Sequence, residues 1–363
     1  MEALYRIELD VDNNTITMIN DLTRMFIMQV VVQIMFYLRN DNVELWSNIF
    51  LENLLFILLG LFICINITVL IADECRTSKW GPQDEIGSAN LITPDSVLKA
   101  SKLIKYGKTY SLGITIDSET PAYPPRSLSL QVVQPTQQFG VLGLPNSTYN
   151  DDVFQGWFGI GSQIDGLGHI GTTDAIFYNC YDGKEFAQIT GLTKLGIEKI
   201  PPIVARGVVI DIAGHLGMTH LEKGATFDLK VLKEAAKSQK IEIQKGDVVL
   251  LHTGWTDAKF KSEPVEWGSG APGIHPNIAR YLASMEVVAV GADTWSLDVV
   301  PPMIANEPYP SHGILLQENG VYILETMNTG PLVKDGVTEF LFVLGQAKIK
   351  GAVQMIINPI AIR

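Results

Sequence analysis

The segment Ile203–Ile212, IVARGVVIDI, is a run of β-branched and apolar residues of the kind that forms a strand inside a protein. Four further short runs of this kind follow it: Asp247–His252 (DVVLLH), Val287–Ala292 (VVAVGA), Gly320–Leu324 (GVYIL) and Phe340–Leu344 (FLFVL). A few helix-start signals are interspersed with these runs. The sequence therefore predicts an α/β layered domain rather than a helical bundle or an all-β sandwich.

Three segments carry the signals of a helix start. Thr93 is an N-cap candidate followed by Pro94 at the first helical position, and this helix is expected to stop at Gly107. Asp228 precedes the helical pattern LKVLKEAAKSQ, and Pro276 begins a third pattern, NIARYLASM. The order of the strands does not follow from one sequence.

The composition excludes several classes of protein. Of the 363 residues 47% are hydrophobic and 18% are charged, which excludes a disordered chain. The net charge is −12 and the sequence has no cluster of Lys and Arg, so no nucleic-acid partner is expected. The three cysteines, Cys64, Cys75 and Cys180, are too few and too scattered for a disulfide framework or a thiolate zinc site.

Residues 1–74 differ from the rest of the chain. Twenty residues from Asn53 to Ala72, NLLFILLGLFICINITVLIA, carry no charge and are long enough to cross a bilayer. Residues 1–74 also hold three arginines against ten acidic residues, and thus seven of the twelve net negative charges. We therefore expect an N-terminal extension over 1–74, with a membrane or signal segment at 53–72, and one large domain over 75–363.

Several interpretations of segment 53–72 stay open. It is either a secretory signal that is cleaved near Ala72 or an uncleaved membrane anchor. A third interpretation is that synthesis of the chain begins at an internal methionine such as Met35, which would place the segment where a signal peptide belongs. A buried core helix is the plainest alternative. Export or membrane attachment fits the length best, so the protein is expected to be membrane-associated or secreted.

Several common catalytic motifs are missing from the sequence. It contains no HExxH, no G-x-S-x-G and no Walker A loop. Gly159-Ile160-Gly161 begins like a dinucleotide-binding fingerprint, but Ile164 stands where the third glycine is needed. Cys180 is a candidate nucleophile, although a single cysteine is more often simply buried.

The glycine-rich segment Phe158–Gly171, FGIGSQIDGLGHIG, places three polar side chains in an apolar setting. In an extended chain Gln163 and Asp165 point to the same face, and His169 can join them across the intervening glycines. Such groups are costly to bury unless they are paired or bind a metal. A surface turn built from Asp and Gly is the alternative.

A second polar set lies far along the chain, in His312–Glu325 (HGILLQENGVYILE). Glu325 closes an apolar strand pattern, where a carboxylate is out of place unless it lies at the exposed end of the strand. Between the two sets, GADTWSLD carries Asp293 and Asp298 and is typical of a turn with side-chain-to-backbone hydrogen bonds.

Together these segments resemble the cyclase-like metal-dependent hydrolases, which include bacterial-type kynurenine formamidase (arylformamidase) and isatin hydrolase. The resemblance covers roughly residues 79–360: WGPQDEIGSANLITPDSVLKA from Trp80, YSLGITIDSETPAYP from Tyr110, then QIDGLGH, GDVVLLHTGW, GADTWSLD and H…GVYILE in this order. The Trp-Gly…Asp-Glu-x-Gly beginning is similar to the larger branch of the family. The resemblance implies the family's α/β swivelling β/β/α fold as a single domain and a homo-oligomer.

The family motif H-x-G-T-H-x-D-x-P-x-H can be laid on this sequence residue by residue. Its first two histidines fall on Gly159 and Gln163, its Asp on Asp165 and its last His on His169. Two histidine ligands of the family are therefore replaced in this chain.

The resemblance implies a single metal site with ligands Asp165, His312 and Glu325, and with Gln163 as a weak oxygen ligand. Two carboxylates, an imidazole and an amide form an oxygen-rich set, which makes Mn²⁺ or Mg²⁺ a candidate beside Zn²⁺. His169 would be the catalytic residue that takes a proton from water and passes it to the leaving group.

Aromatic residues near these motifs are candidate walls of a substrate pocket, although each is also compatible with an ordinary core position. They are Trp157, Phe158 and Trp255, with Tyr178 and Trp295 as further candidates.

The sequence thus predicts a metal-dependent hydrolase that uses activated water to cleave the C–N bond of an amide or cyclic amide in a small-molecule substrate. The resemblance to kynurenine formamidase also suggests a role in tryptophan catabolism. Two alternatives stay open. One is a membrane-attached small-molecule-binding protein on an inactive hydrolase scaffold, motivated by Gly159 and Gln163. The other is a lactonase or hydro-lyase on the same fold.

Overall fold

The computed structural model describes residues 75–133 and 149–363, which belong to one compact unit, Cys75–Arg363. The predicted extension over 1–74, with its apolar segment 53–72, lies outside the described residues. Among the residues that the structure does describe, no helix is both long and apolar enough to cross a bilayer.

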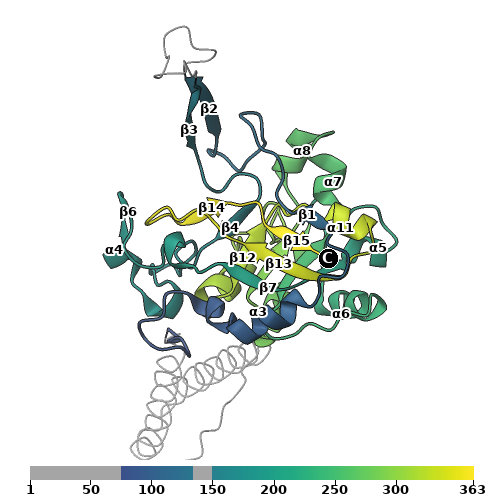
Figure 1. Ribbon diagram of the computed structural model, residues 1–363. Coiled ribbons are helices and arrows are strands. Elements are labelled where there is room, and N and C mark those ends of the chain that lie inside the picture. Colours follow the sequence, from purple (N-terminus) through teal and green to yellow (C-terminus); the bar gives the residue numbers. More distant parts are fainter. Residues whose placement is uncertain (1–74, 134–148) are drawn as a thin grey trace, which may run out of the picture. The chain divides into compact units, whose positions relative to one another are not determined.

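A nine-stranded mixed sheet forms the centre of the unit (Figure 1). In order across the sheet, the strands are β1 (Thr109–Ser111), β15 (Ile360–Ile362), β13 (Glu339–Leu344), β7 (Ile203–Asp211), β9 (Val248–His252), β11 (Ala289–Ala292), β12 (Tyr322–Glu325), β4 (Gln163–Asp165) and β14 (Gln354–Ile356).

The five strands predicted from apolar runs are neighbours in the middle of this sheet. β7, β9, β11 and β12 run parallel to one another, and β13 pairs with β7 in the antiparallel direction. β9, β11 and β12 are buried along their whole length. Parallel strands covered on both faces need apolar side chains at consecutive positions, which is the pattern that the sequence shows. The predicted α/β class is confirmed.

The outer strands β1, β15, β4 and β14 were not recognised as such from the sequence. Each has only three residues and pairs with its neighbours in the antiparallel direction. A strand of three residues is too short to show the alternation of polar and apolar residues that marks a strand. Of these four segments, the sequence predicted an extended chain only at Gln163–Asp165.

Three helices begin where the sequence predicts. α3 (Pro94–Ser101) starts with a capping box between Thr93 and Ser96, α6 (Leu229–Ser238) is capped by the Asp228 carboxylate, and α9 (Pro276–Ser284) begins at Pro276. α3 packs on β7 and β13. It ends before the predicted Gly107, because the backbone amides of Tyr106 and Lys108 bond to the carbonyl of Arg363 at the end of the sheet.

Shorter elements complete the unit. The remaining helices are α4 (Gly183–Phe186), α5 (Ile212–His215), α7 (Trp255–Lys259), α8 (Pro264–Ser269), α10 (Pro310–His312) and α11 (Gly330–Lys334), the 3₁₀ turns η2 (Gly87–Leu91), η3 (Tyr178–Cys180) and η4 (Ile197–Lys199), and the π-helix η5 (Gly313–Glu318). Two small strand pairs join β8 (Thr226–Phe227) to β10 (Gly273–Ile274) and β5 (Ala187–Gln188) to β6 (Gly191–Leu192).

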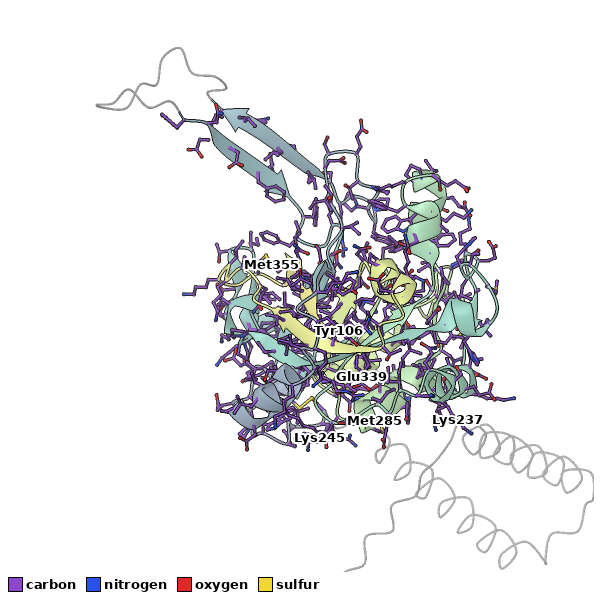
Figure 2. The ribbon with its side chains drawn as sticks, turned by 45° about the vertical axis from the view of Figure 1, so that its right-hand side comes forward. Tyr106, Lys237, Lys245, Met285, Glu339 and Met355 are labelled. Atoms are coloured by element: carbon purple, nitrogen blue, oxygen red, sulfur yellow. A yellow bond between two sulfur atoms is a disulfide. The ribbon has the colours of Figure 1, made fainter. Side chains whose placement is uncertain are left out.

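The hairpin of β2 (Leu128–Val133) and β3 (Asp151–Gly156) extends away from the central sheet (Figures 1 and 2). Most of its residues are exposed, including four apolar ones whose exposed fractions run from 46% to 59%. These are Leu130, Val132, Val153 and Phe154. The base of the hairpin leads directly into the glycine-rich segment that begins at Phe158.

A disulfide joins Cys75 to Cys180, which are 105 positions apart in the sequence. It fixes the first described residue to η3, where Asn179 also bonds to Ser78 and Gly81. The scattered spacing of the cysteines did not predict this pairing. It contradicts the alternative that Cys180 is a free nucleophile.

Candidate metal centre

The register of three neighbouring strands gathers four polar side chains on one face of the sheet. β4 lies between β12 and β14, with Gln163 opposite Glu325 and Asp165 opposite Gln354. Directly opposed residues of antiparallel strands share a face, and so do residues two apart in one strand. Gln163 and Asp165 therefore point to one face of the sheet, as expected for an extended segment.

Asp165 is fully buried, and its two carboxylate oxygens have different surroundings. Oδ1 accepts hydrogen bonds from Nε2 of Gln163 at 3.2 Å and from Nε2 of Gln354 at 2.6 Å. Oδ2 has no hydrogen-bond partner among the described residues. A buried carboxylate oxygen without a donor is costly, which makes Oδ2 a natural position for a cation.

His312 reaches the same face from the other side. It ends α10 and is followed at once by the π-helix η5, an irregularity that is common at functional sites. Asp298 holds it in place: one carboxylate oxygen accepts from His312 Nδ1 at 2.8 Å and from the His312 amide, and the other accepts from the Ser311 amide. This leaves Nε2 facing Asp165 and Glu325, at 3.7 Å and 3.2 Å from their nearest oxygens.

Asp165, His169 and His312 form the candidate metal centre. One potential ligand atom from each residue lies within 4.8 Å of the other two. His169 comes from the turn after β4, where its amide donates to the carbonyl of Gly166, and its ring lies 6.2 Å from that of His312. A carboxylate and two imidazoles are a donor set that divalent metals accept, so these residues fit the predicted group.

Glu325 lies beside this cluster and is not one of its three residues. Its Oε1 contacts His312 and its Oε2 accepts from Nε2 of Gln163 at 2.7 Å. The structure thus brings together all five polar residues predicted for the site, but it uses the Gln163 amide as a hydrogen-bond donor to two carboxylates. Which of the five bind a metal stays a prediction.

The electrostatics of the site favour positive charge between the carboxylates. Burial alone lowers the pKa of His312, but its hydrogen bonds to Asp298 and Glu325 and their charges outweigh burial and raise the pKa to about 10. Burial and the neighbouring Asp165 raise the pKa of Glu325 to about 7. Burial lowers the pKa of His169, which favours a neutral imidazole there.

Arg126 enters the site at the place where the family motif has its first histidine. Its Nη1 donates to the carbonyl of Gly159 at 2.7 Å. A Cβ added at Gly159 would lie 2.7 Å from Arg126 Cζ and from Gln354 Oε1, and closer still to Nη1. The guanidinium therefore occupies space that any side chain at position 159 would need.

The predicted aromatic walls lie in different surroundings. Trp157, at the base of the hairpin, is half exposed, whereas Phe158 is partly buried against the main core. Trp255 is fully buried in a small cluster with Trp267. None of these placements tests their role toward a substrate, which stays a prediction.

The two further aromatic candidates, Tyr178 and Trp295, also contact different parts of the protein. Tyr178 hydrogen-bonds to Asp84 and Ser78 of the N-terminal segment. Trp295 donates from its indole to the carbonyl of Trp267 at 2.8 Å and stacks near Tyr123, with ring centroids 5.9 Å apart.

Sequence reasoning missed three residues of the site: Asp298, Gln354 and Arg126. Asp298 lies in GADTWSLD, where side-chain-to-backbone hydrogen bonds were expected and are found, but its bond to the His312 ring was not foreseen. Gln354 and Arg126 stand in segments without a motif. Only the unexplained loss of a side chain at Gly159 could have pointed toward Arg126.

Comparisons with known proteins agree with this geometry. The cyclase family model matches residues 110–299, which is more than half of the chain. The protein belongs to the cyclase family. No curated relative matches the sequence.

Solved structures extend the match over the cyclase domain. A crystal structure of a novel cyclase shares 30% identity, with a TM-score of 0.73 over 80% of this chain and 99% of that chain. Isatin hydrolase A from Labrenzia aggregata, bound to benzyl benzoate, shares 18% identity and a TM-score of 0.54 over 72% and 94% of the two chains. Isatin hydrolase A from Ralstonia solanacearum shares 17% identity and a TM-score of 0.53, over 70% of this chain and 92% of that chain. At these lower identities the isatin hydrolases share the fold with this cyclase.

Proposed function

We propose that the protein is a metal-dependent hydrolase that cleaves the C–N bond of an amide or cyclic amide by attack of water on the acyl carbon. The observation that carries this proposal is the cluster of Asp165, His169 and His312, in which the buried Oδ2 of Asp165 has no hydrogen-bond donor within residues 75–133 and 149–363. Membership of the cyclase family and the isatin hydrolase fold support it.

The hydrogen bonds around the cluster define what its residues do. Gln163 and Gln354 occupy Oδ1 of Asp165 and so direct Oδ2 into the cluster. Asp298 accepts from Nδ1 of His312 and thereby leaves Nε2 facing Asp165 and Glu325. A divalent cation at this position would polarise the acyl carbonyl and make water more acidic.

His169 is the residue that we assign to proton transfer, which leaves Asp165, His312 and Glu325 as the metal ligands. It is the least buried residue of the cluster, and its lowered pKa keeps the imidazole neutral and able to accept a proton. It takes a proton from the attacking water as the oxygen bonds to the acyl carbon. It then gives that proton to the nitrogen as the C–N bond breaks, so that an acid and an amine leave the site.

The test is an assay of the purified protein against N-formylkynurenine, isatin and a panel of lactones in ¹⁸O-labelled water. We expect labelled oxygen in the product acid, loss of activity after chelation, and recovery with Mn²⁺ or Zn²⁺. A hydro-lyase would leave the product unlabelled. Metal-free protein that hydrolyses the panel at full rate would contradict the proposal.

A second candidate function is a small-molecule-binding protein on an inactive hydrolase scaffold. The replacement of two family histidines by Gly159 and Gln163 favours it. Binding of the same compounds without turnover, even with added Mn²⁺ or Zn²⁺, would support this candidate over the hydrolase.

We also propose that the protein is a homo-oligomer in which the β2–β3 hairpin packs against a second copy. An isolated two-stranded hairpin is marginal in water, and this one exposes apolar side chains on both strands. Light scattering should give a multiple of the monomer mass, and replacing Leu130, Val132 and Phe154 by Ser should shift it to one chain. A wild-type monomer would contradict the proposal.

Finally, we propose that the domain functions outside the reducing cytosol. The support is the Cys75–Cys180 disulfide, since such bonds persist mainly in oxidising compartments. Alkylation of native protein with and without reductant, followed by mass spectrometry, should find these two thiols paired. Free thiols at both positions in native protein would contradict it.

A further inference from the structure

The position of Arg126 and the absence of a side chain at Gly159 are one structural feature. Arg126 lies just before β2, and Gly159 follows β3, so the base of the hairpin brings the two residues together. Because the guanidinium fills the space beyond the Gly159 Cα, a histidine at 159 would require the arginine side chain to move. The chain has a permanent cation where the family motif has an imidazole.

This guanidinium keeps binding capacity. Among residues 75–133 and 149–363, its side-chain hydrogen bond is that from Nη1 to the Gly159 carbonyl, and no carboxylate lies within 4.0 Å. Arginine has five N–H donors in a planar fork that matches a carboxylate. Arg126 is only partly buried. Donors therefore remain for a ligand that enters the site.

Arg126 is also linked to the cluster through one side chain. Through Gln354, whose Oε1 faces the Gly159 position and whose Nε2 bonds to Asp165, the guanidinium and the candidate metal centre share one neighbour.

Aromatic residues lie near the candidate metal centre. The Arg126 amide donates to the carbonyl of Tyr123, whose ring contacts Trp295. The ring of Tyr309 meets that of His312 edge-on, with centroids 5.4 Å apart. Burial raises the pKa of Tyr309 to about 12, so its hydroxyl stays neutral. An aromatic ring thus packs against His312 of the candidate metal centre, which favours an aromatic ligand there.

We propose that Arg126 determines substrate specificity by binding a carboxylate that the substrate carries next to the amide bond to be cleaved. The substrate class is therefore an aromatic amide with an adjacent carboxylate. This inference rests on the proposed hydrolase function. Hydrolysis adds water across the C–N bond, and the carboxylate bound by Arg126 takes no part in that exchange.

A binding experiment tests the inference without requiring turnover. Calorimetric titration of the purified protein with benzoate and with its neutral counterpart benzamide should show roughly 10- to 100-fold tighter binding of benzoate, the range for hydrogen bonds between charged groups. Arg126→Gln should remove this preference and Arg126→Lys should keep part of it. Arg280→Gln, which removes an exposed arginine paired with Glu318, is the matched control and should behave like the wild type.

A kinetic arm separates this inference from the proposed function. N-Formylanthranilate and formanilide share a scissile formamide and differ by one carboxylate, and the ratio of their kcat/KM values should fall in Arg126→Gln. Equal hydrolysis of both by the wild type leaves the hydrolase in place and overturns the inference. Preferential benzoate binding that depends on Arg126, without hydrolysis of either formamide, supports the inference and counts against the hydrolase.

Binding alone decides the remaining cases. Equal affinity for benzoate and benzamide, or no binding of either, overturns the role of Arg126, as does a benzoate preference that survives in Arg126→Gln. Thermal unfolding of each variant shows whether it is folded. Should Arg126→Gln not fold, Arg126→Lys decides: an unchanged benzoate preference in that variant overturns the role of the planar fork.

Discussion

The two sides of the Asp165 cluster are built differently. On the β12 side, which consists of Asp298, His312 and Glu325, two carboxylates and an imidazole support each other through charged hydrogen bonds. On the β4 side, formed by residues 159–165, two family imidazoles are replaced by Gly159 and the Gln163 amide. On this side the Gln163 amide donates hydrogen bonds to Asp165 and Glu325.

This difference shows how a site can lose ligands without losing its buried carboxylates. A buried carboxylate needs donors, and Gln163, Gln354 and the nearby Arg126 provide donors and positive charge. The β12 side keeps the imidazole oriented by Asp298. We therefore expect metal affinity to depend on Asp165 and the β12 side, and ligand preference on the substitutions of the β4 side.

The largest effect is expected from Asp165→Asn, because it removes the buried carboxylate on which the cluster converges. The variant should lose stoichiometric metal, and its kcat/KM should fall by more than the roughly 10- to 100-fold that an outer partner is worth. Metal analysis and the amide assay measure both. Asp152→Asn, on the exposed hairpin, is the control and should match the wild type. Retention of full metal content in Asp165→Asn would show that the ligand set is wrong.

A smaller effect is expected from Asp298→Asn, which weakens the partner that orients His312. Affinity for Mn²⁺ or Zn²⁺, measured by competition with a chelator, should fall roughly 10- to 100-fold. Asp293→Asn is a matched control, because Asp293 is a buried carboxylate of the same segment whose Oδ1 bonds to Thr253 instead. If both variants bind metal equally well, His312 does not depend on Asp298.

The sequence predicted the β12 side better than the β4 side. His312 begins the segment HGILLQENGVYILE and Glu325 ends its apolar strand pattern, where a polar residue stands out. β4 has only three residues, and the partners of Asp165 come from Gln354, 189 positions away, and from within its own strand. Side-chain amides have no motif, so contacts of this kind emerge only from the register of β4 and β14.

The same contrast holds for the fold. The apolar runs gave the five middle strands correctly, because strands buried on both faces need apolar residues at consecutive positions. The short edge strands and the early end of α3 depend on pairing with the C-terminal residues, such as the bonds to the Arg363 carbonyl. Pairing between distant segments leaves no local signal in the sequence.

The smallest effect is expected from Gly159→Ala, which would push a methyl group into the space of Arg126 and Gln354. Overpacking of this kind should lower the free energy of unfolding by roughly 1–3 kcal/mol in chemical denaturation. It should also reduce the preference for benzoate over benzamide. Gly345→Ala, where an added Cβ meets nothing within 4 Å, should stay within about 0.5 kcal/mol of the wild type. If Gly159→Ala leaves both the free energy of unfolding and the preference for benzoate unchanged, the position of Arg126 does not depend on the missing side chain at 159.

The central claim, that this cyclase holds one divalent cation at Asp165, is tested most directly by anomalous diffraction from crystals grown with Mn²⁺ or Zn²⁺. We predict a single peak within coordination distance of Asp165 Oδ2 and of Nε2 of His312. Absence of a peak at this cluster, at metal concentrations that restore activity, would contradict the account.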